Sequence, residues 1–374
     1  MHILMTVNAG WNVVNFRTPL VKGLIADGHR LTVLTPDDGH AEALTGLGCA
    51  FVPLPMDLKG LAPHRDGALV WRFQREFRRL RPDCVLSFTI KNNIYGALAA
   101  RRHGQPVLPN VTGLGTAFLS GRALQLVAEQ LYRRAFARCP TVFFQNGDDR
   151  ELFLDRRLVT AEQTRVLPGS GIDLAKFAPP KAPRPDGRPF TFLLIARLLR
   201  DKGVVEFAEA ARTLRARLPD ARFVLLGPLG ADNRTAIPAE TVESWVSEGI
   251  VEHHPPVGDV RPLIAEADCV VLPSYREGAP RTLLEAAAMG RPLIATDVPG
   301  CRSVVDDGVT GLLCAVRDAD SLALAMARMA AMPPGQRAAM GRAGRAKMER
   351  EYDQAIVVDA YRDAIAASRR RPAA

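Results

Sequence analysis

Residues 269–297 read CVVLPSYREGAPRTLLEAAAMGRPLIATD: an apolar run, a polar loop, a helical segment and a second apolar run. Pro280 has the backbone angle of a first helical turn, Gly290 can adopt the left-handed conformation that ends a helix, and Pro292 prevents its continuation. The pattern predicts a helix over 280–289 between two strands that are buried on both faces. Such strands are typical of a parallel α/β sheet.

The same alternation runs through the rest of the chain and divides it in two. Strands and helices alternate from HILMTV (2–7) to TVFFQN (141–146), and the alternation restarts at FTFLLIA (190–196). Between them lies APPKAPRPDGRP (178–189), which is dense in proline and charge and is typical of a linker. We therefore predict an α/β protein with two doubly wound, Rossmann-like sheets facing a cleft between their strand ends.

A chain of 374 residues exceeds what one hydrophobic core usually serves, so two domains are expected. The expected first domain covers 1–167, a hinge or linker covers 168–187, and the second domain covers 188–350. The remaining segment, 351–374, is expected to be a helix that can pack back on the first domain, followed by a basic tail.

The composition favours a cytoplasmic protein. No uncharged apolar run approaches the roughly 18 residues of a membrane span, and the start, MHILMTVNAGW, lacks the pattern of a signal peptide. The cysteines are scattered without a CxxC pair, so we expect buried free thiols rather than disulfides or a metal site. These cysteines are Cys49, Cys84, Cys139, Cys269, Cys301 and Cys314.

The net charge of +9 lies in the first half of the chain. Residues 1–165 hold 21 Lys and Arg against 14 Asp and Glu, whereas residues 186–374 hold 25 of each. Within 70–81, VWRFQREFRRLR, a helix would gather its apolar residues on one face and its arginines on the rest. The apolar residues are Val70, Phe73, Phe77 and Leu80, and the basic ones are Arg72, Arg75, Arg78, Arg79 and Arg81.

Two interpretations of this basic helix stay open. It can be an ordinary helix with a solvated basic face, or it can contact an anionic membrane surface. Nucleic acid is not expected as a partner, because the chain has no zinc finger, recognition helix or aromatic and basic strand set.

Two cations follow the strand FTFLLIA, at the sheet edge where ligands bind in open α/β proteins. Arg197 and Lys202 lie on the expected turn before the next helix, and together they can hold a diphosphate; a solvated basic loop is the alternative. The small residues Gly278 and Ala279 leave the backbone amides of the helix at Pro280 open to an anion, which favours the diphosphate site.

Two glutamates bracket that helix. Glu285, within the otherwise apolar LLEAAAMG, can accept hydrogen bonds from a vicinal diol such as a ribose, at about 1.5–3 kcal/mol each. A glutamate facing water is the alternative, although a carboxylate without a partner would be costly there. Glu277, on the preceding loop, can contact sugar hydroxyls or stabilise positive charge at an anomeric carbon, and a general base is the alternative. Phosphate and hydroxyl recognition together indicate a sugar nucleotide.

The first half offers weaker candidates. NAGWN, from Asn8, follows the first strand, and Gly10 within it can let the backbone approach phosphate or sugar. Lys91 ends the strand CVLSFT, where it can face an acidic acceptor or be solvated. Neither NAGWN nor TGLGTAF, which begins with Thr112 and Gly113, matches GxGxxG, so a dinucleotide oxidoreductase is disfavoured.

No metal or other cofactor is predicted. Asp318-Ala319-Asp320 matches the DxD pattern that some sugar transferases use to hold a divalent ion, but it directly precedes a helix, where Asp is a favoured N-cap. The pair His253 and His254 lacks the spacing of metal ligands.

Several motifs resemble one family. EGAPRTLLEA, the upstream RLLRDKG, GIDLAKF near the hinge and the trailing GVTGLLC are similar to the retaining family-4 glycosyltransferases of GT-B fold. FRTPLVKGLIADGH, KNNIYGALAARR and NVTGLGTAF look like the subgroup that builds surface polysaccharide or glycan precursors on a polyprenyl diphosphate. Many relatives carry a histidine near the donor in the amino-terminal domain, and the corresponding stretch NVTGLG has none.

The resemblance implies transfer with retention and without a metal. Arg197 and Lys202 would neutralise the donor diphosphate, Glu285 would bind ribose and Glu277 would contact the donor sugar; of these, Glu277, Arg197 and Lys202 are the candidate catalytic residues. The implied donor site also includes Gly10, Gly278, Ala279, Pro280 and Arg281, and the implied acceptor site includes Asn8, Lys91, Thr112 and Gly113.

The expected donor is a UDP-sugar carrying a hexosyl or N-acetylhexosaminyl group. The expected acceptor is a polyprenyl-diphosphate-linked saccharide at the inner face of the plasma membrane, reached by peripheral contact. The alternatives are a GT-B sugar-nucleotide epimerase, which would need no basic membrane-facing domain, and a non-catalytic sugar-nucleotide sensor, which would have no reason to keep both glutamates.

Overall fold

The computed structural model describes residues 1–57, 63–113, 122–180, 187–230, 233 and 235–370. Contacts group the chain into two compact units. One comprises Met1–Gly171 with Gln354–Ala374, and the other comprises Ile172–Asp353.

The first unit is built on a parallel sheet. Among its described residues the sheet has seven strands in the order β3-β2-β1-β4-β5-β6-β7. The strands are β1 His2–Thr6, β2 Arg30–Thr35, β3 Ala50–Pro53, β4 Cys84–Phe88, β5 Val107–Val111, β6 Val142–Phe144 and β7 Thr164–Val166. The helices are α1 Gly10–Phe16, α2 Thr18–Ala26, α3 Ala41–Gly46, α4 Pro63–Leu80, α5 Ala97–Ala100, α6 Arg122–Phe136, α7 Gly147–Asp155 and α15 Gln354–Arg370.

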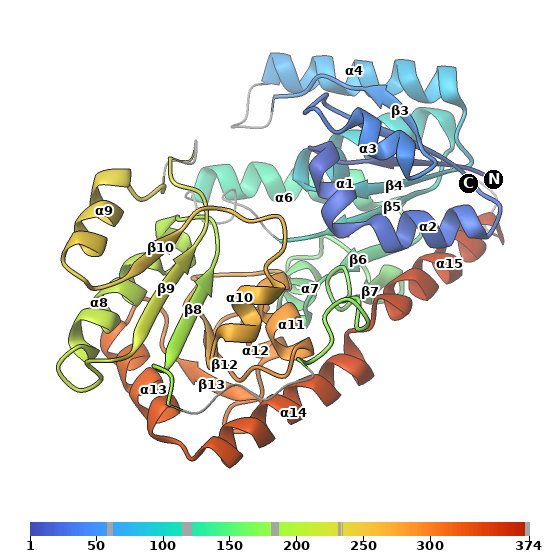
Figure 1. Ribbon diagram of the computed structural model, residues 1–374. Helices are drawn as coiled ribbons and strands as arrows, with labels where there is room; N and C mark the ends of the chain where they lie inside the picture. Colours follow the sequence, from blue (N-terminus) through green and yellow to red (C-terminus); the bar gives the residue numbers. More distant parts are fainter. Residues whose placement is uncertain (58–62, 114–121, 181–186, 231–232, 234, 371–374) are drawn as a thin grey trace. The chain divides into compact units, whose positions relative to one another are not determined.

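The helices cover both faces of this sheet (Figure 1), which explains why its central strands are mostly apolar. In β1, Leu4 packs in the layer of α4, α5, α6 and α7, whereas Ile3 and Met5 pack in the layer of α1, α2, α3 and α15. Successive side chains of a strand point to opposite faces, so both faces need apolar residues.

The second unit repeats this design. Among the residues described there, the parallel sheet has six strands in the order β10-β9-β8-β11-β12-β13. The strands are β8 Thr191–Ile195, β9 Arg222–Leu226, β10 Glu252–His254, β11 Cys269–Leu272, β12 Leu293–Thr296 and β13 Gly311–Cys314. The helices are α8 Val204–Leu214, α9 Ala239–Ser247, α10 Arg261–Glu266, α11 Arg281–Ala288, α12 Cys301–Val304, α13 Ala319–Ala331 and α14 Pro334–Glu351.

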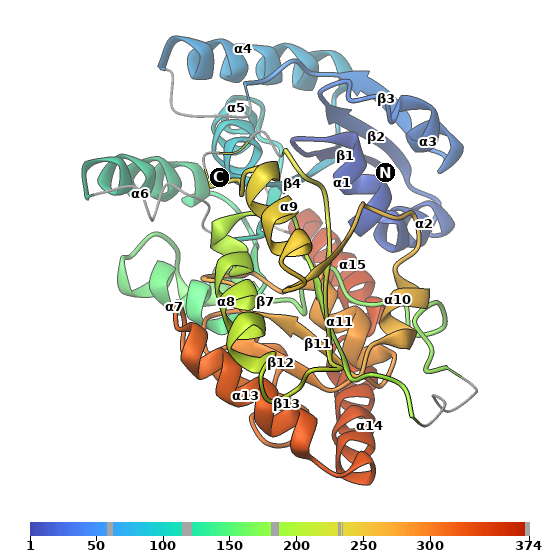
Figure 2. The same cartoon turned by 60° about the vertical axis from the view of Figure 1, so that its left-hand side comes forward.

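Helices again cover both faces of the sheet, as Figures 1 and 2 show. Phe192 and Leu194 of β8 pack with α8, α9 and α13, whereas Leu193 packs with α10, α11 and α12. The predicted doubly wound α/β fold is therefore confirmed for both sheets. The cleft expected between them stays a prediction.

The last helix, α15, packs within the first unit. Arg362 forms a bidentate ion pair with Asp27 at 2.7 and 2.9 Å, and Gly23 of α2 lies close to Val358. Ile172 and Phe177, from the predicted linker, are buried in the core of the second unit, and 181–186 lie outside the described residues. The sequence-based domain boundaries remain predictions.

Some element boundaries differ from those expected. Residues 10–26 form two helices, α1 and α2, that meet at Arg17, because Pro19 lies in the first turn of the second and cannot continue the first. The helical segment from Asn92 to His103 opens as a π-helical turn and closes as a 3-10 turn. The short edge strands β7 and β10 were not predicted.

Two further expectations concern the cysteines and membrane spans. All six cysteines are free and buried, as predicted. Among the residues that the structure describes, no helix combines the length and apolar character that crossing a membrane requires.

Candidate functional site

The candidate site residues of the second unit follow two neighbouring strands. Strand order reverses between β8 and β11, and in open α/β sheets the carboxyl ends of the strands at such a point form the ligand crevice. Arg197 and Lys202 follow β8, and Glu277 follows β11. The topology therefore brings the predicted cations and the predicted loop carboxylate to one edge of the sheet.

A close backbone contact joins these two loops. Gly203 has φ +71°, and a Cβ atom there would lie 2.0 Å from the carbonyl oxygen of Pro273, so no other residue fits without displacement. The carbonyl of Asp201 accepts hydrogen bonds from the Tyr275 amide at 2.9 Å and from the Ser274 hydroxyl at 3.0 Å. The loop that carries Lys202 is thus fixed against the loop that carries Glu277.

Lys202 and Glu277 form an ion pair. The Lys202 ammonium donates to Oε1 of Glu277, and the two side chains are only 22% and 13% exposed. Arg197, by contrast, is exposed, two residues beyond the end of β8. The structure therefore brings one of the two predicted cations into direct contact with the predicted catalytic carboxylate.

Helix α11 begins one residue later than predicted. Pro280 is the N-cap residue, with φ −72°, and its carbonyl accepts the first helical hydrogen bonds, from Leu283 and Leu284. The Thr282 hydroxyl donates to the carbonyl of Ile195 at 3.1 Å, which ties the first turn to the end of β8. Gly290 has the left-handed φ of +71° that the helix end was expected to need.

Glu285 pairs with Arg281 along α11. Nε of Arg281 donates to Oε1 of Glu285 at 2.7 Å, an i,i+4 pair, and the Glu285 side chain is 12% exposed. The alternative of a glutamate facing water is therefore wrong. The cost of burial that pointed to a ligand is partly offset by Arg281, so the ribose contact stays a prediction.

Burial raises the pKa of Glu285, and the charge of Arg281 and its hydrogen bond act in the opposite direction. Lys176 also lowers the pKa of this carboxyl, whereas the nearby Asp259 raises it further. The Glu285 carboxyl is therefore influenced by charges of both signs, from Arg281, Lys176 and Asp259.

Sequence reasoning missed the residues that hold the loops in place. Thr296 of β12 donates to the carbonyl of Ser274, and the Tyr275 hydroxyl donates to Glu206 at 2.6 Å. The Arg317 guanidinium lies 4.6 Å from the centre of the Tyr275 ring. A hydroxyl residue two positions after a buried strand was the available signal for Ser274.

The DxD pattern acts as a helix cap. Asp318 is the N-cap residue of α13, and its Oδ1 accepts a hydrogen bond from the Ser321 amide at 2.8 Å. The cap interpretation is confirmed. Among the described residues, no group of three or more His, Cys, Asp or Glu side chains is arranged to hold a metal ion.

In the first unit, the Asp38 carboxylate lies at the backbone of Gly10, where a phosphate or sugar was predicted to approach. Gly10 begins the seven-residue helix α1, and Oδ2 of Asp38 accepts a hydrogen bond from the Trp11 amide at 3.0 Å. A Cβ atom on Gly10 would lie 2.8 Å from the other oxygen of Asp38. Asn8, just before this helix start, is partly exposed. Donor contact at Gly10 and acceptor contact at Asn8 stay predictions.

Lys91 is not a solvated lysine, so that alternative is wrong. Its ammonium donates to Oδ1 of Asp66 at 3.0 Å, and the two side chains are 11% and 8% exposed. Burial and the neighbouring Asp66 raise the pKa of Tyr95.

Thr112 and Gly113 follow β5 and are partly exposed, and the rest of TGLGTAF lies outside the described residues.

Comparisons with known proteins agree with this architecture. A Glycosyl transferase 4-like domain model matches residues 15–169, and a Glycosyl transferases group 1 model matches residues 189–332. The chain therefore belongs to the group 1, family-4 glycosyltransferases, a family of retaining enzymes of GT-B fold. The epimerase and the non-catalytic sensor are not supported.

Two curated relatives act on lipid-linked glycans. The N,N'-diacetylbacillosaminyl-diphospho-undecaprenol alpha-1,3-N-acetylgalactosaminyltransferase of Campylobacter jejuni is 28% identical over 86% of this chain and 87% of its own. The UDP-Gal:alpha-D-GlcNAc-diphosphoundecaprenol alpha-1,3-galactosyltransferase of Escherichia coli is 29% identical over 66% of each chain.

Solved structures share the fold at low identity. A glycosyltransferase from Rickettsia africae is 16% identical and covers 99% of each chain, with a TM-score of 0.80. Anabaena HepE in complex with UDP-glucose is 18% identical and covers 98% of this chain and 100% of its own, also with a TM-score of 0.80.

The buried Glu285 predicts a pH effect on stability. Because its folded pKa lies above its ordinary value of 4.5, the folded protein holds this proton more tightly than the unfolded chain does. Its contribution to stability is therefore present below pH 4.5 and is lost as pH rises through the folded pKa. We expect the free energy of unfolding of Glu285→Gln, relative to wild type, to increase between pH 4 and pH 8 in urea titrations.

Glu248→Gln is the matched control in the same unit. The Ser244 hydroxyl and Arg212 lower the pKa of Glu248, so the contribution of this carboxylate has the opposite sign and is lost on acidification. A Glu285→Gln variant that loses stability relative to wild type as pH rises would contradict the burial argument.

Proposed function

We propose that this enzyme transfers a hexosyl or N-acetylhexosaminyl group from a UDP-sugar to a polyprenyl-diphosphate-linked saccharide, with retention and without a metal ion. The observation that carries the donor assignment is the Lys202–Glu277 ion pair at the switch point of the second sheet. The lipid-linked acceptors named for the Campylobacter and Escherichia relatives support the acceptor class.

The donor diphosphate is held by Arg197, Lys202 and the start of α11. An ammonium has three N–H donors, so Lys202 can keep its contact with Glu277 while donating to phosphate oxygens. Gly278 and Ala279 contribute backbone, and the positive end of the helix dipole adds to the field. These fixed charges stabilise the leaving nucleoside diphosphate in the role that a metal ion takes in other transferases.

The two glutamates take different parts of the donor. Glu277, held by Lys202, contacts the donor sugar and stabilises positive charge that develops at the anomeric carbon. Glu285, oriented by Arg281, accepts hydrogen bonds from the ribose hydroxyls. In transfer with retention, the nucleoside diphosphate leaves on the face that the acceptor hydroxyl enters.

The acceptor is assigned to the first unit through Asn8, Thr112 and Gly113. Lys91 is the weakest member of this group, because its charge is already neutralised by Asp66. Support for the acceptor side therefore rests more on the relatives than on the geometry of these residues.

The proposed contact with an anionic membrane surface is supported by α4. Phe73 and Phe77 are buried in the core, whereas Arg75, Arg78 and Arg79 are exposed. Trp71, on the same helix, is 59% exposed, and the Arg75 guanidinium lies 5.4 Å from its ring. Tryptophan and arginine together are typical of a surface that meets lipid headgroups.

The donor assignment predicts specific losses. Arg197→Ala and Lys202→Ala should each weaken donor use by about 2–3 kcal/mol, the size of a charge-assisted contact, while the proteins stay folded. Turnover is measured with radiolabelled UDP-sugars and a membrane lipid extract, and it should persist in excess EDTA.

Arg328→Ala, which removes an exposed arginine of α13, is the control and should keep wild-type donor kinetics. Unchanged kinetics in the Arg197 and Lys202 variants would refute the diphosphate assignment. Loss of turnover in EDTA that magnesium or manganese restores would refute metal-independent transfer.

The two glutamates should separate by effect. Glu285→Gln should mainly raise the apparent KM for the donor, because ribose contacts are similar in the ground and transition states. Glu277→Gln should mainly lower kcat, because it acts on charge that develops during transfer. Steady-state kinetics of both variants, with Glu248→Gln as the exposed control, give the comparison. Identical profiles would remove this division of roles.

The basic helix predicts membrane binding that salt weakens. The protein should sediment with vesicles containing acidic phospholipid, and binding should fall above physiological ionic strength, where the screening length drops below about 8 Å. A fourfold change to Gln on α4 should reduce transfer to the lipid-linked acceptor more than to a soluble short-chain analogue. The changed residues are Arg72, Arg75, Arg78 and Arg79.

The matched control removes the same charge from exposed positions of the second unit. Its four residues, also changed to Gln, are Arg217, Arg328, Arg342 and Arg350. This variant should bind vesicles as wild type does. Equal losses with both acceptors, or no vesicle binding at low salt, would mean that α4 is an ordinary solvated helix.

A further inference from the structure

The backbone that carries Glu277 rests on a single glycine. Gly300 is the N-cap residue of α12, with φ +82°, and a Cβ atom there would lie 2.5 Å from the carbonyl oxygens of both Glu277 and Gly278. The Glu277 amide also donates to the carbonyl of Pro299 at 3.3 Å. The start of α12 therefore fixes where the backbone of Glu277 can lie.

Helix α12 cannot hold this position by itself. It has four residues, which is too short for an isolated helix to be stable, so its place depends on tertiary contacts. The Ser303 hydroxyl donates to the carbonyl of Gly300 at 2.8 Å, and the Ser303 carbonyl accepts a hydrogen bond from the Tyr352 hydroxyl at 2.7 Å. Burial raises the pKa of Tyr352 to about 12, so this hydroxyl remains a donor at neutral pH.

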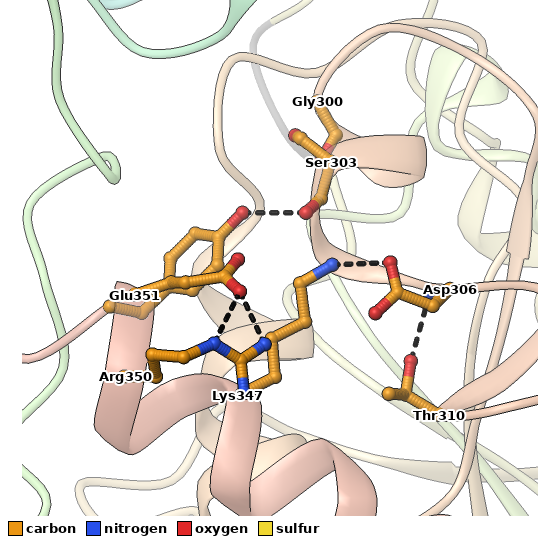
Figure 3. A network of polar contacts seen from close by, with 8 residues as sticks. Gly300, Ser303, Asp306, Thr310, Lys347, Arg350 and Glu351 are labelled. Carbon is orange, nitrogen blue, oxygen red and sulfur yellow. Dashed lines mark hydrogen bonds and ion pairs between the residues drawn. The ribbon is translucent and has the colours of Figure 1, made fainter.

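The turn that follows α12 is held by a second contact. Figure 3 shows Lys347 reaching Asp306, whose Oδ1 accepts from the ammonium at 2.6 Å. Asp306 in turn donates its amide to the Thr310 hydroxyl at 2.9 Å. Lys347 is 5% exposed, so water hardly reaches its charge. The ion pair with Asp306 compensates that buried charge.

Helix α14 holds Lys347 in its last turns, and Tyr352 directly follows the end of the helix. The same helix also supports α11. The Arg345 guanidinium donates to the carbonyl of Ala288, the last residue of α11, at 2.9 Å. A Cβ atom on Gly341 would lie 2.0 Å from the carbonyl oxygen of Gly290, so α14 also touches the backbone just beyond the end of α11. One helix thus supports the elements that carry Glu277 and Glu285.

We propose that Gly300 is a positioning residue for the Glu277 carboxylate and that α14 keeps Gly300 in place through Tyr352 and Lys347. The proposal rests on the donor-sugar role of Glu277 stated above. None of these residues needs to touch the substrate. Instead, they hold Glu277 and its partner Lys202 in position beside the anomeric carbon of the donor sugar. A misplacement of about 1 Å can lower the rate on the order of 100-fold.

The first test replaces Gly300 by Ala. We expect kcat for UDP release from the UDP-sugar that wild type uses fastest to fall about 10- to 100-fold. Affinity for UDP itself, measured by calorimetry, should fall by a smaller factor than kcat, because the Gly278 backbone and Lys202 also serve the diphosphate whereas Glu277 contacts only the sugar, which UDP lacks. A variant that is only damaged in its fold would lose UDP affinity as well.

Gly249→Ala is the matched control. Gly249 has a similar left-handed φ of +69°, but no atom lies within 4 Å of its added Cβ. It therefore carries the backbone strain of the substitution without the collision with Glu277. The proposal is overturned if kcat of Gly300→Ala stays within about twofold of kcat of Gly249→Ala.

A second pair of variants decides the matter if Gly300→Ala does not fold. Tyr352→Phe keeps the buried ring and removes only the hydroxyl that holds Ser303, so kcat should fall about three- to tenfold with UDP affinity retained. Tyr361→Phe removes a buried hydroxyl of the first unit, which accepts from Asn110 at 3.0 Å, and should leave kcat near wild type. Equal kcat values for these two variants would overturn the proposal.

Glu277→Gln, measured in parallel, distinguishes failure of the positioning role of Gly300 from failure of the donor-sugar role of Glu277. If Glu277→Gln lowers kcat while Gly300→Ala and Tyr352→Phe behave like their controls, the positioning proposal fails and the role of Glu277 stands. If Glu277→Gln leaves kcat unchanged, the role of Glu277 fails, and the positioning proposal fails with it.

Discussion

The close approach of Gly203 to the carbonyl oxygen of Pro273 brings the loop after β8 onto the loop after β11. Two similar contacts flank it: a Cβ atom on Gly227 would lie 1.9 Å from the carbonyl oxygen of Ala196, and Gly300 meets the carbonyl of Glu277. Backbone packed on backbone leaves little room to shift, because interiors are dense and compress poorly. The ion pair of Lys202 and Glu277 depends on these contacts, since loops held apart by a Cβ could not bring its two charges together.

Glu285 of α11 and Glu277 of the preceding loop each have a cationic partner within the protein. This pairing affects both the stability of the fold and the orientation of the carboxylates. Burying a carboxylate is unfavourable even when it is paired, as the raised pKa of Glu285 shows. The pairing keeps the carboxylates oriented, so a sugar nucleotide would meet acceptors that are already in position. The second unit as a whole has no net charge, so the cations beside these glutamates are not part of a generally basic surface.

The fold was largely predictable because its strands are buried on both faces, and that produces apolar runs that stand out in the sequence. The edge strands β7 and β10 read TRV and EHH; three residues are too few for a pattern, and their polar side chains suit a sheet edge. The pairing of Arg281 with Glu285 was predictable from i,i+4 spacing. The pairing of Lys202 with Glu277 spans 75 residues and needs the strand order, which local patterns do not contain.

The surface of α4 is less basic than its sequence, because Arg75 and Arg79 both bind the buried carboxylate of Glu76. Each arginine near an acidic membrane contributes about 1 kcal/mol, and neutralised ones contribute less, so charge alone would give this helix only a modest attraction to the proposed membrane surface. Burial of the exposed Trp71 ring at such a surface would add an attraction that salt does not screen, about 25 cal/mol per Å² of apolar surface removed from water. Residual binding at high salt would therefore be the contribution of Trp71, whereas the part that salt removes would be the contribution of the arginines that Glu76 does not neutralise.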